Sequence, residues 1–293
     1  MDETLTTRAE DTRRIELGTL RRRTRHPVTT GRLAIFVTLA VVSAALLYPF
    51  YFMIETSFRS NQQYLLGSGF SLRSWTALFQ GVPVAQEMVN SLGLCAGTIL
   101  AVLVIAAPAG FALAKIRFRG DVFVFLGIMG SMMIPLQSFI IPEYVNFAGL
   151  HLINTYVGAV LVYVAVGTPF STFLMTTFFR GIPDELIDAG LCDGLGYLGV
   201  FRRIALPLSG PALATLIVLR FIPVWNDFLV GLLFLQEPGV RPFTVGLGVL
   251  ASSQLVSVPA LMAGSLLSTI PAAIVYVVFQ RYLVAGLTLG SSQ

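Results

Sequence analysis

Acidic residues gather in one polar stretch of this otherwise apolar chain, PDELIDAGLCDGLGYLGVFRRIALP, at positions 183–207. Its carboxylates, Asp184, Glu185, Asp188 and Asp193, are of a type that serves general acid–base catalysis. No neighbouring pattern predicts a pocket around them, and no nucleophile–base pair accompanies them. Docking of a partner protein therefore explains these carboxylates better than catalysis does.

The residues needed for ATP hydrolysis or for metal binding are missing from the sequence. A phosphate-binding loop ends in Gly-Lys-Ser or Gly-Lys-Thr, whereas the only lysine, Lys115, follows Ala114. The two histidines, His26 and His151, are far apart in the chain and are predicted on opposite sides of a membrane, which excludes a paired-histidine zinc site. We expect no catalytic residue, no metal site and no cofactor bound by this chain.

The glycines of the polar stretch imitate a nucleotide-binding motif. Gly194, Gly196 and Gly199 spell G-x-G-x-x-G. The dinucleotide fingerprint requires a preceding strand and an acidic residue about 20 positions further on. Here a helix is expected before the glycines, and positions 212–218 are apolar apart from Thr215. We interpret the match as accidental.

The polar stretch itself predicts two short helices. Pro183 followed by two carboxylates favours a helix start, because proline suits the first turn and negative charge opposes the helix dipole. That helix is expected to end near Cys192, where Gly194 and Gly196 break it. A second helix is expected from Tyr197 to Ile204, before the next apolar run begins. The product is a helix–turn–helix on a membrane surface.

The composition is that of an integral membrane protein. Of 293 residues, 55% are hydrophobic and 12% are charged. A helix needs about 20 apolar residues to cross a bilayer. These runs are also longer than the strands of an outer-membrane barrel, so the fold is predicted to be all-α. Six candidate spans fall near 33–54, 88–114, 121–142, 155–179, 206–235 and 258–284.

Positive charge predicts the orientation of these spans, because Lys and Arg accumulate in cytoplasmic loops. The N-terminal tail, 1–32, carries eight arginines, and the 183–207 stretch lies on the same predicted side. We therefore expect both termini, including a short tail at 286–293, to be cytoplasmic around a membrane domain at 33–285. Anionic lipid headgroups explain the basic tail more simply than nucleic acid does.

Polar residues inside the expected spans have two interpretations. Gln137 faces either other helices or a water-filled path, and the sequence favours neither. Arg220, Asn226 and Asp227 lie in or beside the fifth span, where ionisable groups face a bundle interior or an aqueous cavity. Arg220 and Asp227 either line a path or pair with neighbouring helices and hold the bundle together.

Small residues and prolines mark the expected spans. Gly93 and Gly97 form a small-x-x-x-small pair, which favours close helix packing in the second span. At least one proline falls in every span, and kinked helices suit a gated path. These prolines are Pro49, Pro108, Pro135, Pro169, Pro211, Pro223 and Pro271.

The polar stretch resembles the EAA loop of permease subunits of ABC importers. The matching residues are Asp188, Ala189, Gly190, Gly194, Ile204, Leu206 and Pro207. Two positions depart from the pattern: Asp188 replaces the usual glutamate, and Gly190 replaces the second alanine. A glycine within a helix costs about 1 kcal/mol relative to alanine.

Further runs are similar to the MalG-like subunits of sugar importers. They are the segment before Lys115, the M-M-I-P-L-Q run at 132–137 with Ile141-Pro142, the G-L-x-x-x-N-T run at 149–155, Trp225-Asn226-Asp227-Phe228, and the Q-R-x-L-V-x-G-L-T run at 280–288. The resemblance implies a six-transmembrane-helix permease fold of the MetI/MalG type with cytoplasmic coupling helices.

The resemblance also implies roles for particular residues. The ATPase-coupling set is Pro183, Glu185, Asp188, Ala189, Gly190, Asp193, Gly194, Phe201, Ile204, Leu206 and Pro207. The translocation path is expected at Gln137, Asn226 and Asp227. Contact with a binding protein is expected at Ser252, Ser253 and Gln254, within an outer loop from Gln236 to about Val258.

The partners follow from the same resemblance. They are two ATPase subunits that hold ATP and Mg, a second homologous permease, and a soluble or lipid-anchored sugar-binding protein, with the bilayer of a bacterial cytoplasmic membrane around them. No nucleic acid is expected. The cargo would be a mono-, di- or oligosaccharide or a polyol derivative. The alternative is a self-sufficient secondary transporter, for which the sequence shows no convincing internal repeat.

Overall fold

The chain is described by a computed structural model over residues 30–252 and 257–289. Within these ranges it forms helices and turns, with no strand. It divides into two units, one ending at Phe52 and one beginning at Met53. Most of the expected N-terminal tail, 1–29, and the last residues, 290–293, lie outside the described residues.

The first unit contains most of one long apolar helix, α2 (Thr30–Ser57), which covers the expected span at 33–54. Its 25 residues from Leu33 to Ser57 are long and apolar enough to cross a bilayer. Pro49 lies inside this helix without ending it. From Leu33 to Phe52 every residue is exposed, so the apolar surface of this segment has no cover within its own unit.

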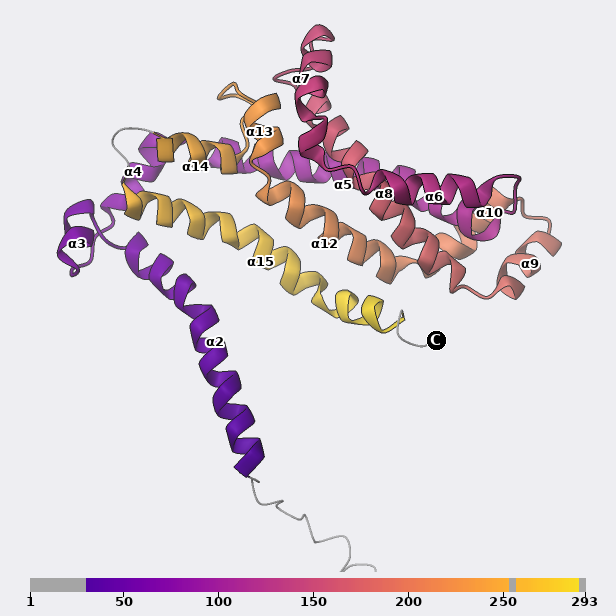
Figure 1. The fold of residues 1–293 in the computed structure, drawn as a ribbon, viewed down its shortest axis with the longest axis horizontal. Helices are drawn as coiled ribbons and strands as arrows, with labels where there is room; N and C mark the ends of the chain where they lie inside the picture. The colour runs from indigo at the N-terminus through magenta and orange to yellow at the C-terminus, as the bar shows by residue number, and fades with distance from the viewer. Residues whose placement is uncertain (1–29, 253–256, 290–293) are drawn as a thin grey trace, which may run out of the picture. The chain divides into compact units, whose positions relative to one another are not determined.

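The second unit is built on four long helices: α5 (Val84–Lys115), α8 (Tyr156–Arg180), α12 (Gly210–Asn226) and α15 (Val258–Leu289). The helices α5 and α8 pack side by side, α12 packs against both, and α15 packs on α12 (Figure 1). Their shared core includes Val102, Ala106, Met175 and Leu216, all nearly inaccessible to solvent. Apolar burial of this kind positions the polar segments at both ends.

Across the described ranges, four helices are long and apolar enough to span a membrane: α2, α5, α8 and α15. A fifth span exists if the bent pair Tyr197–Leu208 and Gly210–Asn226 counts as one, with a bend of 75° between its halves. Ser209 lies at that bend, between Pro207 and Pro211. Proline cannot donate a backbone hydrogen bond, so the helical ladder is weak on both sides of the bend.

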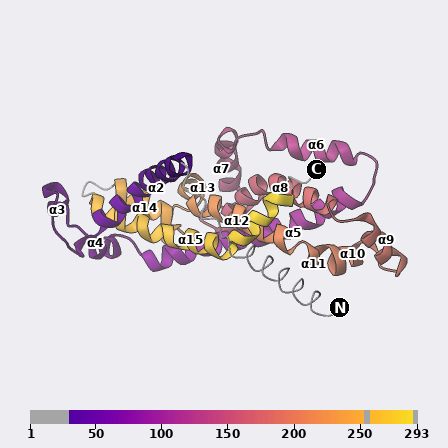
Figure 2. The same cartoon turned by 90° about the horizontal axis from the view of Figure 1, so that it is seen from below.

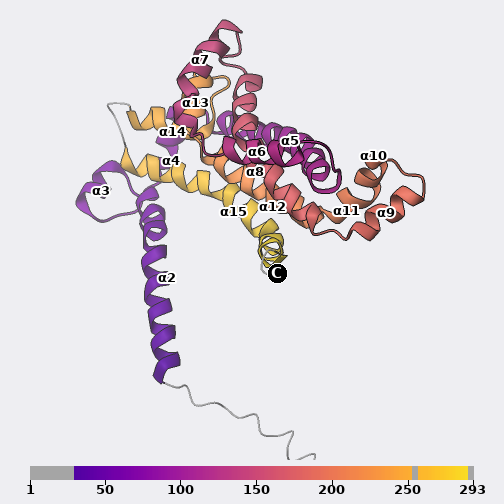
Figure 3. The ribbon, with the colours of Figure 1, turned by 45° about the vertical axis from the view of Figure 1, so that its right-hand side comes forward.

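The segment expected to form the third span, 121–142, is interrupted. It consists of α6 (Asp121–Ser131), a 3-10 turn η1 (Leu136–Ser138) and the start of α7 (Ile140–Gly149). Pro135 adopts an extended conformation and lacks an amide hydrogen, which accounts for the break. Beyond the break, α7 lies beside α13 (Leu229–Phe234), as Figures 1 and 3 both show.

The segment expected to form the fifth span, 206–235, also differs from one helix. After the short α11 (Leu206–Leu208) and α12, the backbone becomes extended at Asp227, with ψ 136°, and α13 then begins. The Asp227 carboxylate accepts a hydrogen bond of 2.8 Å from the Val230 amide, which satisfies a free donor at the start of α13. A polar side chain therefore supports the break.

The two ends of the second unit carry different elements (Figure 2). At one end lie α9 (Asp184–Cys192) and α10 (Tyr197–Val200), and at the other lie α3 (Asn61–Leu66), α4 (Arg73–Gly81) and α14 (Phe243–Ser252). The expectation of a loop from 236 to 258 is wrong at α14. This helix buries Phe243 against Leu78 and Val84, because its sequence is mostly apolar.

The helices α5 and α8 approach each other closely at Gly110. A Cβ atom there would lie 2.6 Å from the Cβ of Met175 and 2.9 Å from the backbone nitrogen of Thr176. The glycine pair singled out from the sequence is less crowded, since a Cβ on Gly93 would meet nothing within 4 Å and one on Gly97 only Val160 at 3.5 Å. Gly110 is thus the position where α5 requires a glycine.

Replacing Gly110 with alanine should lower the stability of the second unit, because the backbone of α8 cannot give way as a flexible side chain would. We expect a loss of about 1–3 kcal/mol, as for overpacked cores. Gly93→Ala is the matched control on the same helix, and it should be neutral or slightly stabilising. Thermal melting of the purified protein in detergent measures both. Equal melting temperatures for the two variants would contradict the packing described.

Candidate functional site

The 183–207 segment forms the two helices expected from the sequence. The first is α9, and the second is α10 continued by a π-helical turn, η2 (Phe201–Ala205). Asp184 and Glu185 occupy the first turn of α9, where negative charge is favourable. We call this segment the polar loop. It connects the end of α8 to the start of α11.

The turn between the two helices depends on Gly194. Its φ is +85°, a left-handed conformation that costs other residues about 1–2 kcal/mol. The amide of Gly194 donates to the carbonyl of Leu191 at 3.1 Å, and the amide of Leu195 donates to that of Gly190 at 3.1 Å. These bonds close the C-terminus of α9 and fix the direction in which the chain leaves it.

The inner face of the polar loop is buried against the long helices. Ile187, Val200 and Phe201 join a single apolar cluster with Phe111 of α5 and Phe179 of α8. The ring of Phe201 lies 5.3 Å from that of Phe111 and 6.2 Å from that of Phe179, and these two rings meet edge-on at 5.7 Å. Such aromatic contacts add stability beyond area burial. The loop is therefore held on the ends of α5 and α8.

Position 190 requires a small residue, because the second helix of the polar loop packs closely against it. A Cβ at this position would lie 2.6 Å from the Cδ1 of Ile204 and 3.1 Å from the Cγ2 of Val200. The close neighbours of Gly190 thus lie within the polar loop itself. Its departure from the alanine of the EAA pattern is compensated by close packing of α9 against η2.

A polar anchor also ties the loop to α5. The Lys115 ammonium donates to the carbonyl of Ile182 at 2.5 Å and to Asp184 Oδ1 at 2.5 Å. The Lys115 side chain is buried, whereas that of Asp184 is exposed. The hydrogen bond from Lys115 and then its charge hold the pKa of Asp184 below its ordinary value. The carboxylate therefore remains ionised at neutral pH, and the pair is lost only in strong acid.

The outer face of the polar loop is exposed and mixed in character. Among the residues predicted to couple to an ATPase, Gly190 and Phe201 are buried, and Ile204 and Leu206 are half-buried. Sequence reasoning passed over three exposed apolar residues beside them, Leu186, Tyr197 and Leu198. The exposed members of the predicted set are Pro183, Glu185, Asp188, Ala189, Asp193, Gly194 and Pro207.

Only one of the residues predicted for a translocation path lines a cavity. A cavity of about 190 Å³ lies among α5, α8 and α12, and Asp227 is part of its wall. Asn226 is exposed and donates to the carbonyl of Ile222 at 2.9 Å. Gln137 is exposed in η1. The structure does not bring these three side chains together around this cavity.

The polar groups of the fifth span reach α8. The Tyr163 hydroxyl donates to Asp227 Oδ2 at 3.0 Å, and Arg220 Nη1 donates to the carbonyl of Gly167 at 3.4 Å. The Arg220 guanidinium also lies 5.4 Å from the ring of Phe170. These contacts agree with the interpretation that Arg220 and Asp227 hold neighbouring helices together. Both residues also line the cavity, so neither interpretation excludes the other.

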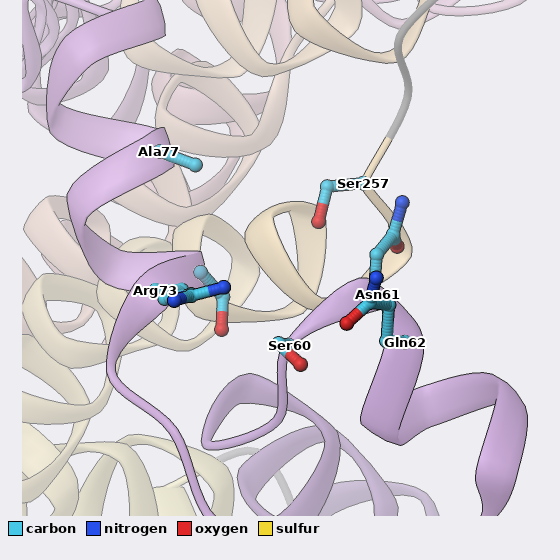
Figure 4. A pocket seen from close by; sticks show the side chains of 7 residues that line it. Ser60, Asn61, Gln62, Arg73, Ala77 and Ser257 are labelled. Carbon is cyan, nitrogen blue, oxygen red and sulfur yellow. The ribbon is translucent and has the colours of Figure 1, made fainter.

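At the opposite end from the polar loop, a pocket of about 240 Å³ is lined by polar residues (Figure 4). Asn61 belongs to α3, Arg73 to α4, and Ser257 precedes α15. Of the residues predicted to contact a binding protein, Ser252 ends α14 and its hydroxyl donates to the carbonyl of Val249 at 2.9 Å. The other two, Ser253 and Gln254, lie outside the described residues.

Two asparagines, Asn90 and Asn154, hold the backbone of the segment before α14 in place. Neither was predicted from the sequence to have this role. Asn90 Nδ2 donates to the carbonyls of Gly239 at 3.1 Å and Arg241 at 2.9 Å, and Asn90 Oδ1 accepts from the Tyr156 hydroxyl at 2.7 Å. Asn154 Oδ1 accepts from the amide of Gln236 at 2.7 Å. This end of the unit is therefore fixed to α5 and α8 by amide side chains.

These features define a helical membrane protein with an exposed polar loop that is fixed to the ends of its core helices. Residues 106–288 match the family described as "Binding-protein-dependent transport system inner membrane component". The match covers more than half of the chain. This protein belongs to that family.

Several proteins of similar sequence are named as permeases of transport or uptake systems. The chain is 34% identical over 201 residues to the arabinooligosaccharides transport system permease protein AraQ of Halalkalibacterium halodurans, covering 69% of this chain and 71% of AraQ. It is 29% identical to AraQ of Bacillus subtilis, over 88% and 95%. It is 26% identical to the diacetylchitobiose uptake system permease protein NgcG of Streptomyces coelicolor, over 85% of each.

The fold has a solved counterpart. A crystal structure of a bacterial ABC transporter involved in the import of the acidic polysaccharide alginate contains a chain with a TM-score of 0.77 to this one. The two chains are 22% identical, and the match covers 87% of this chain and 97% of the other. This likeness confirms the predicted permease fold. The predicted count of six spans is not confirmed, because four helices of the described residues, or five with the bent pair, are long and apolar enough to cross a membrane. The protein is a permease subunit of an ATP-driven importer, and the alternative of a secondary transporter is not favoured.

The turn of the polar loop offers a matched pair of glycines for a test. Gly194→Ala should destabilise the end of α9 by about 1–2 kcal/mol, because alanine is strained at a positive φ. Gly196→Ala should have little effect, since Gly196 has an ordinary φ of −74° and open space around it. Hydrogen exchange of α9 amides, followed by mass spectrometry, measures the difference. Equal exchange in the two variants would disprove the role of the turn.

Proposed function

We propose that this permease imports a sugar, which is a mono-, di- or oligosaccharide or a polyol derivative. Proteins of similar sequence support this, since the names of AraQ and NgcG include arabinooligosaccharides and diacetylchitobiose. The motif runs shared with MalG-like subunits point to the same class of cargo. The chain itself carries no catalytic role in this proposal.

The observation that carries the proposal is the two-sided structure of the polar loop. Its inner face packs on Phe111 and Phe179 at the ends of α5 and α8, and its outer face exposes Glu185, Asp188 and Ala189. A partner that binds the outer face would transmit its movement to the ends of two core helices. We assign that partner as an ATPase subunit, and the polar loop as the coupling element.

The proposed transporter contains further subunits. Two ATPase subunits hold ATP and Mg on the cytoplasmic side, where the positive-inside pattern places the polar loop and both termini. A second, homologous permease completes the translocation path, because one bundle of this size makes a narrow conduit. The complex lies in a bacterial cytoplasmic membrane and requires no nucleic acid.

A soluble or lipid-anchored sugar-binding protein delivers the cargo at the opposite end. The polar pocket at Asn61, Arg73 and Ser257 forms the proposed contact, together with the predicted residues Ser252, Ser253 and Gln254. Asn90 and Asn154 hold the adjoining backbone in place, so docking there would be felt by α5 and α8. Gln137, Asn226 and Asp227 remain the proposed path residues.

The test is ATP hydrolysis by the complex reconstituted in lipid, with and without the binding protein and candidate sugars. In Asp188→Arg the outer face of the loop gains a positive charge where a carboxylate stood, and like-charge or unpaired contacts at an interface cost several kcal/mol. We expect stimulated hydrolysis to fall about tenfold or more, the change that follows from 1.4 kcal/mol.

Arg119→Glu is the matched control, because Arg119 is exposed in the connection after α5 but belongs to no part of the polar loop. It should leave stimulated hydrolysis near the wild-type rate. Sugar uptake by the permease alone, without an ATPase, would contradict the proposal. So would an Asp188→Arg complex that hydrolyses ATP and transports sugar normally.

A further inference from the structure

The cavity between α5, α8 and α12 has two charged residues in its wall, Arg220 and Asp227, which form no ion pair with each other. Arg220 lines it, and no carboxylate lies within ion-pair distance of Arg220 among the described residues, whose two ion pairs are Glu55 with Arg59 and Lys115 with Asp184. An arginine within a membrane span is costly unless a partner or water compensates its charge. This cost needs an explanation, because aliphatic side chains would fill the same space without it.

The other charged group in the cavity wall does not neutralise Arg220. Asp227 lies seven residues further along, which is about 10 Å along a helix axis. Its carboxylate already accepts hydrogen bonds from the Tyr163 hydroxyl and the Val230 amide. Asp227 therefore serves the break between α12 and α13 and the link to α8. The charge of Arg220 remains available.

The Arg220 side chain is positioned rather than loosely placed. Phe170 lies 5.4 Å from the guanidinium, and Arg220 Nη1 makes one long bond to the carbonyl of Gly167. A Cβ on Gly167 would lie 3.0 Å from Arg220 Nη1, so glycine leaves the room that the guanidinium occupies. Arg220 Nε is buried and has no hydrogen-bond partner. The guanidinium is thus held in place, and its Nε donor forms no hydrogen bond.

A second unused donor lines the same cavity. Thr98 of α5 is 0% exposed, and its hydroxyl has no hydrogen-bond partner. A buried hydroxyl without a partner costs free energy, so it is expected where a ligand or water completes it. Thr98 and Arg220 come from different helices and face one volume of about 190 Å³. Most of the remaining lining is aliphatic.

We propose that this cavity is a solute site that selects a sugar ring bearing a carboxylate, such as a uronic acid. Arginine binds a carboxylate through two parallel hydrogen bonds, and the Thr98 hydroxyl donates to a ring or carboxylate oxygen. The small volume suits one sugar unit. This inference rests on the proposed function, since it assigns a specificity site within the importer.

The experiment is saturation-transfer NMR on the permease–ATPase complex in lipid nanodiscs, without the binding protein. Galacturonate and galactose are the probes, because they differ only in a carboxylate against a hydroxymethyl group. Galacturonate should bind at least about tenfold more tightly than galactose, as expected for one hydrogen bond between charged groups. Arg220→Gln should remove that preference, and Arg281→Gln, on the exposed part of α15, should preserve it.

Thr98→Val keeps the shape of the side chain and provides a second variant should Arg220→Gln fail to assemble. It should weaken galacturonate binding about threefold or more, as for one neutral hydrogen bond. Equal binding of the two probes by the wild type, a preference unchanged in Arg220→Gln, or an unchanged affinity for galacturonate in Thr98→Val would overturn the inference. If the second permease supplied a carboxylate to Arg220, the wild type would bind galacturonate and galactose equally.

Stimulation of ATP hydrolysis by the binding protein, measured on the same complexes, distinguishes a failure of the cavity inference from a failure of the proposed function. Stimulated hydrolysis without a galacturonate preference refutes the cavity inference alone. Absence of stimulation with any sugar refutes the proposed function instead.

Discussion

The contact of Phe201 with Phe111 and Phe179 is the interaction on which the rest of this structure depends. It joins the polar loop to the ends of α5 and α8, the two helices that pack most extensively on each other. Ile187 and Val200 extend the contact, and Lys115 adds a buried charged anchor. A loop attached only by its two chain ends would move freely, whereas an apolar face packed on core helices moves with them. The loop is thus part of the helix bundle in mechanical terms.

The same logic explains where the bundle is tight and where it is interrupted. Gly110 allows α5 and α8 to approach closely near their polar-loop ends, so a push on one helix is felt by the other. Towards the opposite end, α12 stops at Asp227 and α13 starts, with a carboxylate joining the break to Tyr163 of α8. Breaks within spans are tolerated where protein groups satisfy the freed backbone. The cavity lined by Arg220 and Asp227 lies beside this break.

The sequence predicted features that depend on neighbouring residues. The start of α9 at Pro183, its end before Gly194 and the second helix from Tyr197 follow from local chemistry, and the structure contains all three. The sequence could not show which prolines interrupt a span. Pro49 and Pro108 lie inside continuous helices, as do Pro169 and Pro271, whereas Pro135 lies at a break, and only tertiary packing distinguishes them.

Contacts between distant positions were beyond the sequence for the same reason. Lys115 meets Ile182 across 67 positions, and Asn90 meets Arg241 across 151, so neither pair could be found by spacing. The candidate site was therefore predicted as a stretch of chain and not as a surface. The division of the polar loop into an inner face around Phe201 and an outer face around Asp188 appears only once α5 and α8 are in place.

We infer that the polar loop and α5 move as one body. The distance between a spin label on the loop and one on α5 tests this most directly. Leu100, exposed on α5, and Cys192, exposed on α9, are suitable positions, because Cys95 is buried. Electron–electron resonance on the reconstituted complex would compare the nucleotide-free and ATP-bound states, with labels on the ATPase reporting closure. We predict an unchanged Leu100–Cys192 distance while the ATPase closes. A shift of several ångströms in that distance would show that the loop moves independently and would contradict the account.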